Sequence, residues 1–224
     1  MMQLELDHLF VCVELGGPEA SLLDAVGLTQ GTGNVHEGQG TQNVRYFFDN
    51  AYLELIWVHD PAETQHARTR PTGIWERCRW CETGACPFGV ALRPAAGSDG
   101  PYPFATWTYR PLYLPAGVTI PVAANSDRLN EPLVFVATIG AAPSTYPAAR
   151  RQPLDHPAGV RRMTSVKLTL PGAEPISAEL AKVVDLGLVT VERGEAFHME
   201  VVFDEAVQGV AHRFEPELPL SVRL

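Results

Sequence analysis

Alternating apolar and polar positions predict short strands near the start of the chain, with one helix among them. Residues 4–13 are apolar and β-branched between polar ends, as in a strand. A Gly-Gly-Pro break at residues 16–18 precedes a stripe of apolar residues that ends at Gly27, which predicts a helix. Further strand-like runs cover residues 28–34, 44–49 and 52–59. The predicted order of elements is β-α-β-β-β.

The C-terminal part of the chain repeats this order. Residues 163–170 alternate as a strand does, and an apolar stripe that ends at Gly187 predicts a second helix. Three more candidate strands follow at residues 188–192, 197–203 and 218–224. Each set of elements covers only about 60 residues, which is marginal for an independent domain. The sequence therefore predicts an α+β fold of paired βαβββ modules that arose by internal duplication.

A long segment rich in proline, glycine and aromatic residues separates the two sets. It is too long for a simple linker in a compact protein. Within it, residues 86–93 and 132–138 resemble strands and residues 74–80 a short helix. We therefore expect three parts, which are a first module over 1–60, an insertion with additional strands over 61–158 and a second βαβββ-like module over 159–224.

Composition and charge exclude several classes of partner. Hydrophobic residues make up 46% and charged residues 19% of the chain, as in an ordinary globular protein. The net charge of -9, without a run of lysine or arginine, argues against nucleic acid and against an anionic membrane surface. No apolar stretch approaches the roughly 20 residues of a membrane span, and the first residues do not resemble a signal peptide. A cytoplasmic protein is expected.

The cysteines suggest free thiols rather than a metal site. Cys78, Cys81 and Cys86 have a spacing that could serve zinc, which prefers four cysteine or histidine ligands. A fourth ligand is not evident nearby, although His66 lies upstream. Without a secretion signal, a disulfide framework is not expected either. We interpret the segment as a partly buried helix and loop.

Three stretches of the sequence resemble a known superfamily. They are Leu-Asp-His-Leu-Phe-Val at residues 6–11, His-Glu-Gly-Gln-Gly-Thr-Gln-Asn at 36–43 and Tyr-Leu-Glu-Leu-Ile at 52–56. Together they resemble the vicinal oxygen chelate superfamily, and more narrowly its glyoxalase-like domain proteins. The resemblance implies paired βαβββ modules whose curved mixed sheet forms a cup around a small-molecule ligand. It implies no single reaction, because the superfamily includes isomerases, epimerases, dioxygenases, thiol transferases and metal-free binding proteins.

His8 and Glu54 match the positions from which the superfamily draws metal ligands in its first module. An imidazole and a carboxylate together suit a divalent metal such as zinc, iron, manganese or nickel. Such an ion would hold substrate oxygens and stabilise an enolate-like charge. The alternative is a metal-free polar pocket, in which the His8 ring bonds a backbone carbonyl and the Glu54 carboxylate pairs with a cation such as Arg45.

The second module departs from the metal-binding pattern. Its matching positions fall near Ser165 and Ser221, which are poor ligands. His198 and Glu200 lie close in sequence and could substitute in an irregular site. Because two protein ligands rarely hold a catalytic metal tightly, the sequence favours the metal-free pocket.

A glycine-rich stretch over residues 36–45 is a second candidate for ligand binding. Its glycines permit close approach of the backbone, and Gln39 and Asn43 offer amide donors and acceptors. His36 could act as a general base, since the ordinary pKa of histidine lies near neutrality. Arg45 ends the stretch and is a further candidate ligand-binding residue. The alternative is a turn whose side chains satisfy one another.

Aromatic and amide side chains could complete the cavity wall. Trp57, Trp107 and Tyr109 offer apolar surface to a ligand, although ordinary core packing is favoured for Trp57. Asn125 follows an apolar strand and could reach a ligand that carries a carboxylate.

These candidates support two functions. The first is a glyoxalase-like enzyme that acts on a small polar organic molecule, with lyase- or isomerase-type chemistry next to a carbonyl and His8, Glu54 and His36 as its catalytic residues. The second is a metal-free protein of the same fold that binds or sequesters a small molecule. Either would function as a monomer or a homodimer.

Overall fold

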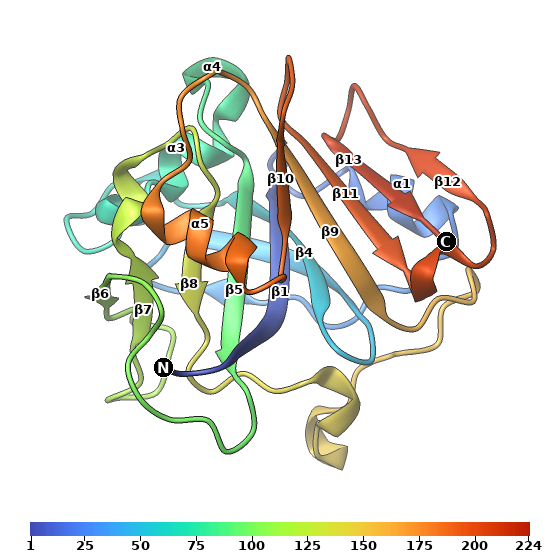
Figure 1. The fold of residues 1–224 in the computed structure, drawn as a ribbon, viewed down its shortest axis with the longest axis horizontal. Helices are drawn as coiled ribbons and strands as arrows, with labels where there is room; N and C mark the ends of the chain where they lie inside the picture. Colours follow the sequence, from blue (N-terminus) through green and yellow to red (C-terminus); the bar gives the residue numbers. More distant parts are fainter.

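The computed structural model describes residues 1–224, and its strands fall into two sheets. The strands of the larger sheet are β1 (Leu4–Cys12), β2 (Val35–His36), β3 (Thr41–Phe47), β4 (Tyr52–Val58), β5 (Phe88–Pro94), β6 (Thr106–Tyr109), β7 (Ile120–Ala123) and β8 (Leu133–Val136). Those of the smaller sheet are β9 (Met163–Leu170), β10 (Thr190–Arg193), β11 (His198–Phe203), β12 (Ala211–Arg213) and β13 (Leu220–Arg223). Figure 1 shows the two sheets beside one another.

The helices are short. They are α1 (Ala20–Ala25), α2 (Pro61–Thr64), α3 (Ile74–Cys78), α4 (Trp80–Thr83) and α5 (Ala178–Asp185), with 3-10 turns η1 (Arg70–Thr72), η2 (Ala124–Asp127), η3 (Pro143–Thr145), η4 (Ala148–Arg150) and η5 (Asp204–Ala206). None of them has the length and apolar character that a bilayer crossing by a helix requires.

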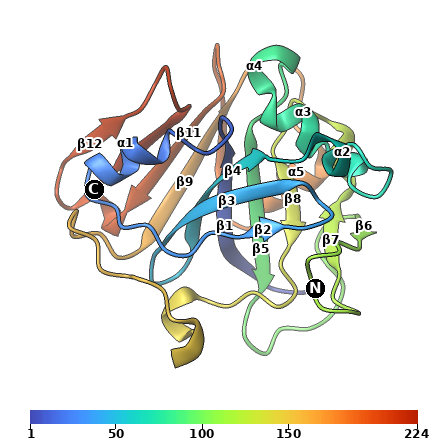
Figure 2. The same cartoon turned by 180° about the vertical axis from the view of Figure 1, so that it is seen from behind.

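The larger sheet consists of two matching halves. Its strand order is β2-β3-β4-β1-β5-β8-β7-β6. In each half the first and last strands are parallel neighbours, which are β1 with β4 and β5 with β8. The halves join through the antiparallel pair of β1 and β5. This arrangement confirms the expected α+β fold with a curved mixed sheet, and Figure 2 shows the N-terminal half from behind.

The division of the chain differs from the one expected. The second half of the larger sheet comes from β5 to β8, which lie within the expected insertion over residues 61–158. Residues 163–223 instead form the smaller sheet, in the order β10-β9-β11-β13-β12. The sequence does not reveal the middle module because no helix separates β5 from β6, so the β-α-β pattern is missing there.

The helix of the C-terminal part packs on the larger sheet. In Figure 1, α5 crosses in front of β5 and β8. Its N-terminal cap, Ser177, is held by the carboxylate of Glu131, which accepts the Ser177 backbone N–H at 2.7 Å. Leu180 and Val183 on α5 are fully buried in a core of 37 residues that both sheets share. The C-terminal module therefore supports the sheet that carries the cavity described below.

Strand alternation separates this shared core from a second apolar cluster. On β1, Leu9 and Val11 face the shared core, whereas Phe10 and Cys12 face the opposite side. The residues of the second cluster come from β1, β4, β6, β7, β8 and α3. This cluster is the floor of the cup.

Candidate functional site

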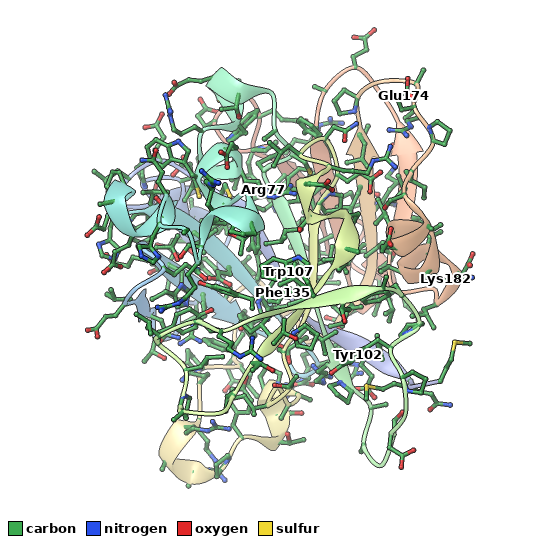
Figure 3. The ribbon with its side chains drawn as sticks, turned by 90° about the vertical axis from the view of Figure 1, so that its left-hand side faces the viewer. Arg77, Tyr102, Trp107, Phe135, Glu174 and Lys182 are labelled. Carbon is green, nitrogen blue, oxygen red and sulfur yellow. The ribbon has the colours of Figure 1, made fainter.

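A cavity of about 310 Å³ opens on the concave side of the larger sheet. Its floor is apolar and is formed by Phe10, Ile56, Ile74, Ile120, Val122, Leu133 and Phe135. In Figure 3, Phe135 lies near the middle of the molecule, whereas Lys182 on α5 lies at its edge. Polar side chains gather at one side of this floor, on β1, β3 and β4. Such a cavity, apolar with a few convergent polar groups, is typical of a small-molecule site.

A β-bulge places two neighbouring polar residues in the cavity. Along β1 and β5, Leu6 pairs with Leu92, but the next pair is His8 with Ala91. Asp7 is the extra residue, so the alternation of side chains changes phase there. Asp7 and His8 therefore both line the cavity, although adjacent residues of a regular strand point to opposite faces.

Asp7, His8 and Glu54 form a buried chain of titratable groups. Nδ1 of His8 donates to Oδ1 of Asp7 at 2.7 Å, since a carboxylate only accepts. Nε2 of His8 lies 3.6 Å from Oε2 of Glu54. The three residues are 3%, 7% and 4% exposed, in chain order. Parallel pairing of β1 with β4 brings His8 beside Tyr52, whose ring stacks on the imidazole at 4.3 Å.

The remaining carboxylate oxygens differ in their partners. Oε1 of Glu54 accepts from Nδ2 of Asn43 at 2.5 Å, so an amide rather than Arg45 satisfies it. Oδ2 of Asp7 is buried without a hydrogen-bond partner, and the nearest cation, Nη1 of Arg93, lies 3.7 Å away. An unsatisfied acceptor of this kind is costly in a protein interior. Oδ2 of Asp7 is thus enclosed by the protein, with the longer ion pair to Arg93 as its compensation.

The predicted glycine-rich stretch lines the cavity beside this chain. The Thr41 hydroxyl accepts from Nε2 of Gln39 at 2.8 Å and bonds Nδ1 of His36 at 2.9 Å. Tyr109 donates to Oε1 of Gln39 at 3.2 Å. Burial lowers the pKa of His36 and raises the pKa of Tyr109, so both groups are neutral at pH 7. These residues form a neutral polar wall.

Arg45 reaches the cavity from β3 without a carboxylate partner. Its Nε donates to the Thr32 carbonyl at 2.8 Å, and Nη2 contacts the Thr32 hydroxyl and Oδ1 of Asn34 at 3.4 and 3.3 Å. The guanidinium carbon lies 5.0 Å from the centre of the Phe47 ring and 5.7 Å from that of Tyr52. It is half-buried.

Three predicted site residues lie outside the cavity. Trp57 belongs to the shared core, because it stands three residues after Glu54 and faces the other side of β4. Trp107 packs beside the second cluster and donates from Nε1 to the Ser126 hydroxyl at 2.9 Å. Asn125 is buried at the cap of α5, where it donates to Glu131 at 2.8 Å. The structure brings none of these three side chains into the cavity, and for Trp57 it agrees with the core packing that the sequence favours.

Residues that were not predicted complete the site. They are Asp7, Tyr52, Tyr146, Arg150 and the apolar floor. Tyr52 could have been predicted from the sequence, because residues two apart on a strand face the same side and Tyr52 stands two residues before Glu54. Asp7 gave no such signal, since regular alternation places it opposite His8.

The donor set does not fit a metal held by several protein ligands. Only His8 and Glu54 converge. In the second half β8 takes the place of β4, and it turns the apolar Leu133 and Phe135 to this side. No group of three histidine, cysteine, aspartate or glutamate side chains in the structure is arranged to hold a metal ion. The matching positions expected at Ser165 and Ser221 belong to the smaller sheet.

The other candidate ligands are engaged elsewhere. His198 bonds the Ser221 hydroxyl at 2.8 Å and pairs with Glu215, while Glu200 pairs with Lys167 at 3.6 Å. They lie on the smaller sheet and do not line the cavity.

The cysteines are free. Cys81 is exposed and Cys86 is buried, where burial raises its pKa to about 12. Cys78 lies 3.3 Å from Cys12, sulfur to sulfur. Arg77, labelled in Figure 3, is fully buried beside them and donates to the carbonyls of Cys86 and Glu131.

Comparison with known proteins places this geometry in a wider context. A family model described as a glyoxalase-like domain matches residues 6–184. No curated protein matches the sequence significantly. Among solved structures, a hypothetical protein from Staphylococcus aureus is 11% identical with a TM-score of 0.55, and the match covers 99% of both chains. That likeness shows a shared fold.

Two further solved structures match with lower TM-scores. Methylmalonyl-CoA epimerase in complex with methylmalonyl-CoA and NH4+ is 15% identical with a TM-score of 0.41, covering 63% of this chain and 98% of that one. A xylose isomerase-like TIM barrel/4-hydroxyphenylpyruvate dioxygenase fusion protein is 13% identical with a TM-score of 0.44, covering 93% of this chain and 38% of that one.

Proposed function

The chain belongs to the glyoxalase-like domain family, and we propose that it catalyses proton transfer at a carbon next to a carbonyl group in a small polar organic molecule. The observation that carries this proposal is the buried chain of Asp7, His8 and Glu54 on the wall of an apolar cavity. A base and an acid within reach of the same substrate atoms are what such a reaction requires.

Each member of the chain has a separate role. Asp7 is a positioning residue, because its bond to Nδ1 of His8 fixes the ring and directs Nε2 at Glu54. The 3.6 Å between Nε2 and Oε2 of Glu54 is too long for a good hydrogen bond, so both atoms are available to a substrate. Glu54 removes the proton from carbon, and His8 donates the Nε2 proton of its imidazolium to the carbonyl oxygen. The product of this step is an enol. When the enol O–H proton passes back to Nε2 of His8, the proton held by Glu54 returns to a carbon of the enol, the carbonyl forms again and both groups regain their starting states.

Asn43 and Tyr52 hold this pair in place. Asn43 occupies one oxygen of Glu54, which leaves the other oxygen to act as the base. The Tyr52 ring covers one face of the imidazole. Rigid support of this kind keeps reacting groups in their productive geometry.

Exchange of carbon-bound hydrogen in heavy water tests the proposal directly. The protein is incubated with short 2-oxo acids, and loss of the signal of the hydrogen on the neighbouring carbon is followed by proton NMR. Catalysed exchange is expected with at least one compound, and Glu54→Gln and His8→Asn should each slow it by at least about 100-fold, the usual worth of acid–base catalysis. Glu192→Gln, an exposed change on the smaller sheet, is the matched control.

Exchange that continues unchanged in Glu54→Gln and His8→Asn would contradict the proposal. Absence of exchange with every compound would favour the second candidate, a protein that binds a small molecule without changing it. The apolar floor of the cavity is the observation that supports this alternative. In that case a bound compound raises the melting temperature and is recovered intact.

A further inference from the structure

We propose that Arg45 recognises a carboxylate, and that the ligand of this cavity is therefore a small organic acid whose carbonyl lies within a few bonds of its carboxylate. That the ligand has a carbonyl group rests on the proposed function, whereas that it has a carboxylate rests on the surroundings of Arg45.

The first support is an unbalanced positive charge at the cavity. The three hydrogen bonds of Arg45 all end on neutral oxygens, those of Thr32 and Asn34. Nη1 makes no hydrogen bond within the protein, and no carboxylate lies within ion-pair distance of the guanidinium. A half-buried guanidinium without an anion is unfavourable, and its planar fork matches a carboxylate. The protein thus fixes the orientation of Arg45 and leaves its charge for a ligand.

The second support is the distance between Arg45 and the acid–base pair. The Tyr52 ring lies 4.3 Å from the imidazole of His8 and 5.7 Å from the guanidinium carbon, centre to centre. The guanidinium is therefore at most about 10 Å from the imidazole, which is the sum of the two distances. A charge-assisted hydrogen bond takes about 2.8 Å and a reacting contact about 3–3.5 Å. Because 10 Å is an upper limit, the remainder accommodates at most about two or three bonds of roughly 1.5 Å.

The third support is the arrangement of charge on the cavity wall, where Arg45 is the register partner of Glu54 on the neighbouring strand but forms no ion pair with it. Asp7 and Glu54 stand at the acid–base end and would repel a carboxylate there. Arg150, which is exposed and lies 5.4 Å from the centre of the Tyr146 ring, lines the cavity without an acidic partner. The favoured place for the carboxylate of an organic acid is therefore beside the arginines, and its neighbouring carbon then lies toward Glu54.

Binding measurements separate this inference from the proposed function. Phenylpyruvate, 2-oxohexanoate and their methyl esters are titrated by calorimetry and by thermal shift into the native chain, Arg45→Gln, Arg45→Lys and Glu54→Gln. The acids are expected to bind the native chain at least 10-fold more tightly than their esters. Arg45→Gln should abolish this preference, Arg45→Lys should restore part of it, and Glu54→Gln should keep it. Arg110→Gln, a change at an exposed arginine outside the cavity, is the matched control.

The outcomes of the two experiments are distinct. Equal binding of acids and esters, a preference that survives Arg45→Gln, or no binding of any of these probes would each overturn the inference. If exchange in heavy water occurs without a preference for acids, only the inference fails. If Arg45 selects acids but no exchange occurs, only the proposed reaction fails, and the protein is an acid-binding protein.

Discussion

Gly89→Ala is expected to move the Phe10 ring into the ligand cavity. Gly89 and Phe10 are register partners on β5 and β1. A Cβ atom at Gly89 would lie 1.9 Å from Cε1 of Phe10 and 2.3 Å from its Cδ1. Because carbon atoms pack at about 3.5–4.0 Å, the ring must shift by roughly 2 Å. Phe10 is only 3% exposed, and the open space beside it is the cavity.

The cost of this shift can be estimated. Overpacking of this kind destabilises a protein by about 1–3 kcal/mol. The loss of unfolded-state freedom on replacing glycine by alanine returns only about 0.4–1 kcal/mol. At roughly 2–4 °C per kcal/mol for a chain of this size, Gly89→Ala should lower the melting temperature by several degrees. A ligand that occupies the floor should also bind more weakly, because the displaced ring takes part of its space.

A double-mutant cycle with Phe10→Leu provides the assay. Stability is measured by urea unfolding for both single variants and the double variant, and binding of the 2-oxo acids is measured beside it. Leucine lacks the ring edge that meets the new methyl group, so the double variant should be more stable than the sum of the single effects predicts. Additive effects, or a Gly89→Ala variant that matches the native chain in stability and binding, would refute the steric reasoning.

Four further predictions concern other parts of the molecule. Glu131→Gln should lower the free energy of unfolding by about 2–4 kcal/mol, because the buried carboxylate accepts from Asn125 and from both the N–H and the hydroxyl of Ser177. Glu179→Gln, measured by the same unfolding experiment, is the control. Burial lowers the pKa of His156, whose Nδ1 accepts the Thr29 N–H at 2.9 Å. The contribution of neutral His156 to stability is therefore complete above about pH 6.5 and is lost as the pH falls below that value. The drop in melting temperature between pH 7 and 5 should be smaller in His156→Gln than in the native chain, and unchanged in the control His59→Gln. Ellman's reagent should modify Cys81 quickly and the buried Cys12 and Cys86 only after unfolding, and Cys81→Ser should remove the fast phase. Elemental analysis of protein purified without chelator should find less than one zinc, iron, manganese or nickel ion per chain, and a stoichiometric ion lost in His8→Ala would contradict the metal-free site.

The local pattern of the sequence predicts the strands that carry the site, but not all of their neighbours. Alternation over β4 places Glu54 with Tyr52 and Ile56 and assigns Trp57 to the other face, as the structure shows. It cannot show that β5 pairs with β1, because that pairing joins segments about 80 residues apart in the chain. The sequence pattern therefore predicts the second half of the cup in the C-terminal module, whereas β5 to β8 form it.

Asn125 illustrates a second limit of sequence reasoning. A polar residue after an apolar strand suggests a binding site, and Asn125 is indeed buried and hydrogen-bonded. Its partners, Glu131 and Ser177, come from separate parts of the chain and serve to attach α5 to the larger sheet. Burial of a polar group only requires that it find a partner, and a distant segment of the same chain satisfies this as well as a ligand does.

The phase change in β1 connects sequence, fold and proposed chemistry. Leu4 and Leu6 occupy even positions, whereas Leu9 and Val11 occupy odd ones, and all four pack toward the shared core. A regular strand cannot turn both sets to one face, so one extra residue must be accommodated between them. The two polar residues at the junction, Asp7 and His8, are then forced onto the concave side together. The same apolar pattern that anchors the strand in the core thereby brings a carboxylate into contact with the imidazole, and parallel pairing with β4 supplies Glu54 beside it.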